Sequence, residues 1–345
     1  MIKNINNNIQ ILPDRIITVD GYTASGKGVL CKYLQSFKNV ENMCVDHLFH
    51  EISLLSESNR LSKEIGQYLF KIKINEKFEN TLLSRNLNFR PYDDSSIFKT
   101  GKTFEYIKRL FNEDGSNIFN LLDKYKNNNF LLMSHFSMPF INFFFETLTD
   151  KLRFINIIRH PVYTYSHWIY LFESLSINKN RIYKFLNEYK GKLFFWFENP
   201  NEAYDMSLNE RFISSILYLN EQSNLKKNNL KNQFKKNFKT ISFEKFVMET
   251  DVIEAELIDF LQLSKSKHTD KIKKSLDLNQ NFFSERTFIR GKKGWFIKKN
   301  KETQLDYEKK LSKIKLGTSQ DIYSKFLDEC RNYELQNSLK MIITN

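Results

Sequence analysis

The sequence predicts a three-layer α/β protein, in which helices flank a parallel sheet that carries a phosphate-binding loop. A short, β-branched apolar run at 16–19 ends in a glycine-rich turn, and a helical pattern follows over 27–37. Two further apolar runs, at 129–136 and 153–161, are separated by a helix-like segment. This strand–helix–strand order is typical of a parallel sheet.

The remaining segments indicate one domain with insertions. Residues 1–14 are polar and rich in asparagine, so we expect a loose lead before a single α/β domain over 15–345. Mostly helical insertions are expected at about 50–125 and at about 171–235, and a helical tail at about 303–340. No internal repeat or linker-like composition divides the chain.

A strand, a turn and an amphipathic helix are expected over 239–263, and an irregular, basic segment over 281–300. A weaker strand-and-turn signal lies over 39–52.

The composition indicates a packed protein that favours anionic ligands. The chain has 345 residues, 41% of them hydrophobic, and a net charge of +13. Cys31, Cys44 and Cys330 form no CxxC pair, which fits a reducing compartment and argues against a zinc site. The N-terminus lacks an apolar signal-peptide core, and no apolar stretch reaches membrane length. We therefore expect a cytoplasmic protein.

The first turn has the features of a phosphate-binding loop without a metal anchor. Glycines let consecutive N–H groups point inward at a helix N-terminus, and Lys27 adds a positive charge. In P-loop kinases a Ser or Thr follows this lysine and holds Mg²⁺. Here no hydroxyl follows, so we expect a phosphate whose transfer needs no metal. The candidate phosphate-binding residues are Gly21, Thr23, Ala24, Ser25, Gly26, Lys27, Gly28 and Val29.

A second anion site is expected after the run at 153–161. Arg159 stands where this strand ends, Pro161 turns the chain, and Ser166 lies about two turns into the following helix. In open α/β sheets, ligands bind at the carboxyl ends of the strands. Arg159 and Ser166 can bind a phosphate through charged donors and a hydroxyl.

The stretch "IIRHPVYTYSHW" resembles the 3′-phosphate-binding segment of sulfotransferases that use 3′-phosphoadenosine 5′-phosphosulfate (PAPS). The loop resembles that family's 5′-phosphosulfate loop, which does not require Mg²⁺. The stretches "NFLLMSHFSMPF", "TISFEKFVMETDVIEAELIDFLQL" and "FSERTFIRGKKGWFIKKN" resemble its other conserved segments. Two features depart from the family pattern. Ala24 replaces the lysine or arginine before Ser-Gly, and Ser166 follows Arg159 by seven residues instead of eight.

The resemblance implies transfer of a sulfuryl group from PAPS to a hydroxyl or amine of a small molecule or glycan, without a metal. Lys27 would stabilise the phosphosulfate and His135 would act as the base, with His47 and His50 as alternatives and Asp46 as a residue that orients the acceptor. Arg290, Gly291 and Lys292 would close over the 3′-phosphate.

Two other classes of protein compete with this interpretation. A P-loop kinase or nucleotide hydrolase with an unusual metal position would also need the loop. A nucleic-acid-binding protein fits the charge. However, the aromatic residues lie within apolar runs and do not alternate with Lys and Arg on a surface. We therefore expect no nucleic-acid partner.

Overall fold

The computed structural model describes residues 9–112, 118–177, 186–279, 284–291, 294–301 and 303–339. The contacts divide the chain into two compact units. The first comprises Met1–Ile158, Lys226–Ile241 and Glu249–Gln280, and the second comprises Arg159–Leu225, Ser242–Met248 and Asn281–Asn345. The expectation of a single domain with insertions stays a prediction.

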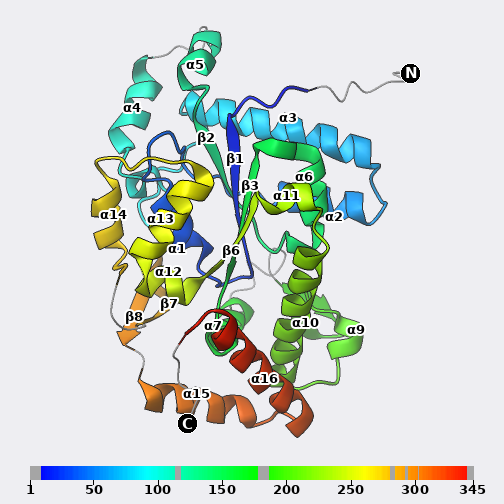
Figure 1. The fold of residues 1–345 in the computed structure, drawn as a ribbon. Helices are drawn as coiled ribbons and strands as arrows, with labels where there is room; N and C mark the ends of the chain where they lie inside the picture. The colour runs from blue at the N-terminus through cyan, green and yellow to red at the C-terminus, as the bar shows by residue number, and fades with distance from the viewer. Residues whose placement is uncertain are drawn as a thin grey trace. The chain divides into compact units, whose positions relative to one another are not determined.

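A four-stranded sheet lies at the centre of the first unit (Figure 1). Its order is β2 (Asn129–Met133), β1 (Arg15–Asp20), β3 (Leu152–Ile158) and β6 (Phe238–Ser242). β1 pairs in parallel with β2 on one side and with β3 on the other. The predicted α/β class is confirmed. From β1 the chain passes first to β2 on one side of β1 and then to β3 on the other side. The order of strands therefore reverses at β1, and α/β sheets bind ligands at such a point.

Helices flank both sides of this sheet. Figure 1 shows α1, α13 and α14 on one side of β1 and α2 and α6 on the other. The helices of the first unit are α1 (Lys27–Leu34), α2 (Leu48–Glu57), α3 (Lys63–Leu82), α4 (Thr103–Asn112), α5 (Ile118–Tyr125), α6 (Ile141–Leu148), α11 (Asn232–Lys235), α13 (Thr250–Leu261) and α14 (Thr269–Ser275), with the short 3-10 helices Ile97–Lys99, Met138–Phe140 and Thr149–Lys151. The segment at 84–99 is irregular apart from the 3-10 helix Ile97–Lys99.

Aromatic side chains fill the core between the sheet, α3 and α6. Phe144 packs edge-on against Phe70 of α3 and against Phe154 of β3, with ring centroids 5.0 and 5.8 Å apart. All three rings are fully buried. Because both faces of the sheet are covered, the strands read as continuous apolar runs in the sequence.

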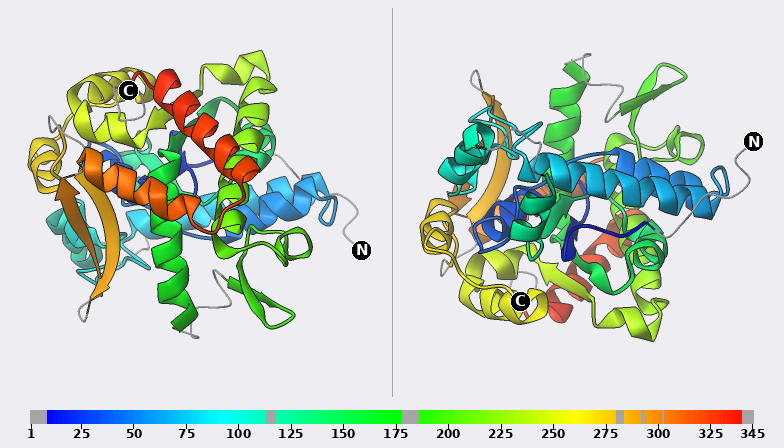
Figure 2. Two further views of the ribbon diagram at one scale, coloured as in Figure 1. Left: turned by 90° about the horizontal axis from the view of Figure 1, so that it is seen from below. Right: turned by 90° about the horizontal axis from the view of Figure 1, so that it is seen from above.

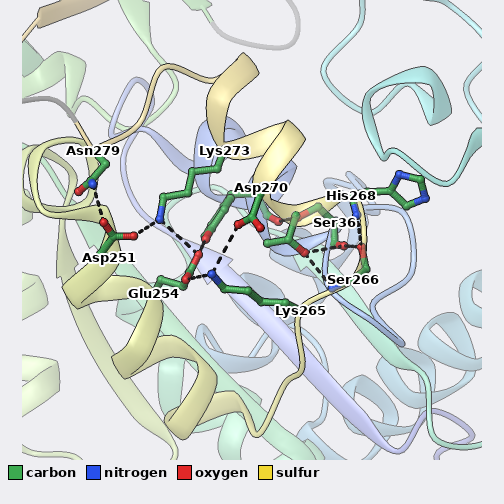
Figure 3. Close-up of polar contacts among 11 residues, drawn as sticks. Ser36, Asp251, Glu254, Lys265, Ser266, His268, Asp270, Lys273 and Asn279 are labelled. Atoms are coloured by element: carbon green, nitrogen blue, oxygen red, sulfur yellow. Dashed lines mark hydrogen bonds and ion pairs between the residues drawn. The ribbon is translucent and has the colours of Figure 1, made fainter.

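A polar network holds α13 and α14 against α1 (Figure 3). Lys273 pairs with Asp251 and Glu254, and the hydroxyl of Ser266 donates to the backbone oxygen of Ser36, 2.6 Å away. Ser36 lies just beyond the end of α1. Helix α1, which begins at the glycine-rich loop, is therefore fixed at its far end.

The second unit is mostly helical. It contains α7 (Pro161–Ile177), β4 (Leu186–Tyr189), β5 (Lys192–Phe195), α9 (Pro200–Ala203), most of α10 (Leu208–Asn228), α12 (Phe243–Met248), β7 (Ser284–Gly291), β8 (Gly294–Lys301), α15 (Gln304–Lys315) and α16 (Gln320–Gln336). In Figure 2, α15 (orange) and α16 (red) are joined by a turn and contact α7.

Two expectations about local structure are wrong. The basic segment at 281–300, expected to be irregular, contains an antiparallel hairpin in which Arg290 pairs with Trp295 and Gly291 with Gly294. The stretch before His47 makes only isolated bridges from Val40 and Cys44 to β2. Within the described residues, no helix combines the length and apolar character needed to cross a membrane.

Candidate functional site

The loop after β1 has the backbone geometry of an anion nest. Gly21, Ala24 and Gly26 have positive φ angles of 152°, 73° and 100°. A Cβ on Gly21 would lie 2.3 Å from the backbone oxygen of Ile157, so only glycine fits there. Alternation of positive and negative φ turns consecutive N–H groups toward one side. The backbone angles of the loop therefore suit a cradle of N–H groups before α1, and phosphate binding there stays a prediction.

The side chain of Lys27 binds the backbone of its own loop. Its ammonium donates hydrogen bonds to the backbone oxygens of Gly21, 2.7 Å away, and Tyr22, and the residue is only 4% exposed. Burial lowers the pKa of Lys27 to about 8, although the nearby Asp20 carboxylate opposes this shift.

Gly28 makes room for a carboxylate at the first turn of α1. A Cβ on Gly28 would lie 3.1 Å from Oδ2 of Asp94, which belongs to the irregular segment. Asp94 forms ion pairs with Lys32 at 2.5 Å and with Lys99 at 3.8 Å. Gly28 thus supplies no hydroxyl next to Lys27. The carboxylate of Asp94 lies beside it, and its charge is neutralised by Lys32 and Lys99.

Asp20 joins the phosphate loop to the turn that follows β2. Its carboxylate is fully buried and accepts hydrogen bonds from the hydroxyl of Ser134 at 2.8 Å and from the backbone N–H groups of Ser137 and Met138, each at 2.9 Å. Burial raises the pKa of Asp20, although these hydrogen bonds act to lower it. The role of Asp20 could not be predicted from the sequence, because its partners lie more than 110 residues away.

His135 lies on the turn that Asp20 holds. Its half-buried ring stacks on the ring of His47, with centroids 5.2 Å apart and planes at 22°. Burial, together with the positive charges of Lys27, His47 and His50, holds its pKa well below the usual histidine value. The structure thus brings the three candidate histidines into one cluster beside the loop lysine.

The carboxylate of Asp46 contacts α2 and α3. Its carboxylate accepts from the backbone N–H of Leu48 at 3.0 Å and pairs with Lys77 of α3 at 2.9 Å. Burial would raise its pKa, but these contacts outweigh burial and lower it. No group of His, Cys, Asp and Glu within the described ranges is arranged to hold a metal ion.

Arg159 opens the second unit, directly after the last residue of β3. Its side chain is 4% exposed, and its guanidinium lies over the ring of Phe243 at 5.2 Å and over that of Tyr163 at 6.0 Å. Its charge also contributes to the low pKa of His167, about 3, of which burial is the main cause. Arg159 is therefore a buried cation held by aromatic rings.

The turn after Arg159 is fixed by residues from distant parts of the sequence. The backbone N–H of Val162 donates to Nδ1 of His160, so Nε2 carries the proton and donates to Glu334 at 3.1 Å. The backbone N–H of His160 donates to Glu244, whose carboxylate also accepts from Tyr333. These contacts from α12 and α16 could not be predicted, since nothing in the local sequence indicates them.

The other residues predicted to bind the 3′-phosphate are less directly placed. The hydroxyl of Ser166 donates to the backbone oxygen of Val162, 2.9 Å away, within α7. Arg290 and Gly291 belong to β7, and Lys292 lies outside the described residues. Their roles stay predictions.

No protein-family model matches the chain, and no curated protein matches it. Four solved structures that resemble it are sulfotransferases. The sulfotransferase domain from the curacin biosynthetic pathway matches with a TM-score of 0.43 and 12% identity, over 96% of this chain and all of the other. The sulfotransferase domain from the Synechococcus PCC 7002 olefin synthase matches with a TM-score of 0.40 and 14% identity, over 77% of this chain and 79% of the other. A sulfotransferase from Mycobacterium avium matches with a TM-score of 0.37 and 10% identity, over 76% of this chain and 67% of the other.

Proposed function

We propose that the protein is a sulfotransferase that transfers a sulfuryl group from PAPS to a hydroxyl or amine acceptor on a small molecule or glycan, in the cytoplasm. One observation carries this proposal. The loop leads into a helix whose first turn has Gly28 at the position where a metal-dependent P-loop enzyme places a hydroxyl. The proposal involves no nucleic-acid partner.

The residues present fit the donor. The inward N–H groups of the loop and the ammonium of Lys27 suit a 5′-phosphosulfate. The hydroxyl of Ser25 is buried without a hydrogen-bond partner among the described residues, as expected of a group that serves a ligand. The buried guanidinium of Arg159 suits the 3′-phosphate, for which Ser166, Arg290, Gly291 and Lys292 remain further candidates.

Two side chains would carry the chemistry of transfer. His135 keeps a neutral imidazole because its pKa is low, so it can accept the proton of the acceptor hydroxyl. Lys27 can place its ammonium where negative charge develops on the leaving phosphate. The bound donor supplies the sulfuryl group.

A second candidate is a P-loop kinase or nucleotide hydrolase, which Asp94 favours. Its carboxylate beside Gly28 is a type of ligand that Mg²⁺ accepts. Lys32 and Lys99 neutralise Asp94, and this weakens its attraction for a metal.

Calorimetry with two nucleotides separates the candidates. We expect 3′-phosphoadenosine 5′-phosphate to bind equally well with Mg²⁺ and with a chelator, and more tightly than ATP under either condition. Loss of its binding in chelator, or a tenfold preference for ATP with Mg²⁺, would contradict the sulfotransferase proposal and favour the kinase or hydrolase.

A further inference from the structure

A cavity of about 450 Å³ lies in the second unit, between α9 and the first half of α10. This volume is within the range of small-molecule sites. Its walls combine the apolar side chains of Phe197, Met206 and Leu219 with the hydroxyls of Ser214 and Ser215 and the carboxylate of Glu202. None of these residues takes part in the proposed transfer reaction.

A buried ion pair forms one part of the cavity wall. The guanidinium of Arg211 donates to both carboxylate oxygens of Glu198, at 3.0 and 2.9 Å, and to the backbone oxygen of Leu193 at 2.8 Å. It also lies over the ring of Phe194, 4.1 Å from the centroid. Because these two charges neutralise each other, neither is available to a charged ligand.

Aromatic packing fixes another part of the wall. The ring of Phe197 stacks on Phe195, with centroids 5.2 Å apart, and contacts Trp168 of α7 at 4.8 Å. The side chain of Asn199 caps α9, which begins at Pro200. The cavity is therefore bounded by groups that are held in place without a ligand, which lowers the entropic cost of binding.

The remaining charge at the cavity is negative. Glu202 is exposed and accepts a hydrogen bond from Asn199 at 2.6 Å, and no cation of the described chain forms an ion pair with it. Ser214 and Ser215 are half-buried and offer hydroxyls that donate or accept. A phosphate or carboxylate would meet a like charge here, whereas an amine would meet an opposite one.

We propose that this cavity binds an amphipathic small molecule that has an aromatic or aliphatic body and a cationic amine at one end. The apolar side chains take the body, Glu202 attracts the amine, and the serine hydroxyls bind other polar groups of the ligand. This site does not depend on the proposed sulfotransferase activity, because none of its residues holds a phosphate.

Three probes that differ in one terminal group test the proposal: tyramine (cationic), 2-(4-hydroxyphenyl)ethanol (neutral) and 3-(4-hydroxyphenyl)propionate (anionic). Their dissociation constants are measured by ligand-detected NMR on the full chain. We expect tyramine to bind best, about fivefold more tightly than the propionate, as for a partly exposed charge pair. In Glu202→Gln, the dissociation constants of tyramine and the propionate should differ by no more than about twofold. The control is Glu221→Gln, which changes an exposed carboxylate of α10 outside the cavity and should leave the ratio of the two dissociation constants unchanged.

A second pair of variants locates the binding. Ser215→Phe fills the cavity and should abolish tyramine binding, whereas Asn224→Phe on an exposed part of α10 should not, with folding of both checked by circular dichroism. The proposal is overturned if no probe binds at millimolar concentration, if the propionate binds as well as tyramine, or if folded Ser215→Phe retains the affinity.

Discussion

The carboxylate of Asp20 accepts a hydrogen bond from the backbone N–H of Ser137, 117 residues further along the chain. Asp20 ends the strand that leads into the phosphate loop, and Ser137 belongs to the turn that carries His135. One buried side chain thus connects the two parts of the candidate site in the first unit. Its hydrogen bonds from two N–H groups require an acceptor, which the carboxylate provides.

Asp20→Asn should therefore destabilise the protein. An amide cannot accept all of these hydrogen bonds, and each buried donor left unsatisfied costs about 1–3 kcal/mol. Urea denaturation should show a loss of this size, whereas Ser134→Ala, which removes one hydrogen bond, should cost about 1 kcal/mol. Equal stability of Asp20→Asn and the wild type would show that the carboxylate does not hold the turn.

The parallel sheet and the loop after β1 could be predicted because their signals are local. The run at 16–19, the glycines and the helical pattern lie next to one another in the sequence. The roles of Asp20, Asp94 and Glu334 could not be predicted, because each depends on a partner brought close by the fold. The basic hairpin was missed because its two strands carry charged residues in place of a clear apolar alternation.

Gly28→Ser should not create a metal site. The new Cβ would approach Oδ2 of Asp94 to 3.1 Å, so the carboxylate must shift, and we expect a destabilisation of about 1 kcal/mol. Asp94→Ala in the same chain should relieve this contact, which a double-mutant cycle of denaturation free energies would show as coupling. If Gly28→Ser made nucleotide binding depend on Mg²⁺, Gly28 alone would have accounted for the metal independence expected of the wild type.

Affinity for 3′-phosphoadenosine 5′-phosphate should fall as the pH rises through about 8. The pKa of Lys27 in the free protein is about 8, because burial disfavours its charge, and only the protonated form attracts an anion. Lys27→Arg should flatten this alkaline fall, since an arginine stays charged. Titrations of both proteins between neutral pH and about pH 9 provide the measurement. Identical profiles would assign the pH dependence to another group.

Arg159→Ala should weaken binding of 3′-phosphoadenosine 5′-phosphate by about 1.5–3 kcal/mol, the range for hydrogen bonds to charged groups. Adenosine 5′-phosphosulfate lacks the 3′-phosphate and should bind almost unchanged. Arg153→Ala, a half-buried arginine of β3, is the matched control and should affect neither ligand. Equal losses for both ligands in Arg159→Ala would mean that Arg159 acts through the fold, for example through its packing on Phe243.

His135→Ala should reduce turnover by about 10²–10⁴-fold, the usual contribution of a general base, once an acceptor is available. The pKa of His135 lies well below the ordinary histidine value, so its imidazole is neutral near pH 7, and wild-type activity should fall only at clearly acidic pH. Affinity for 3′-phosphoadenosine 5′-phosphate should stay nearly intact, because His135 is assigned to neither phosphate. His268→Ala, whose ring lies near Gly101, should leave turnover unchanged. If folded His135→Ala kept wild-type turnover, the base would have to be sought at His47, which stacks on it, at His50 or at Asp46.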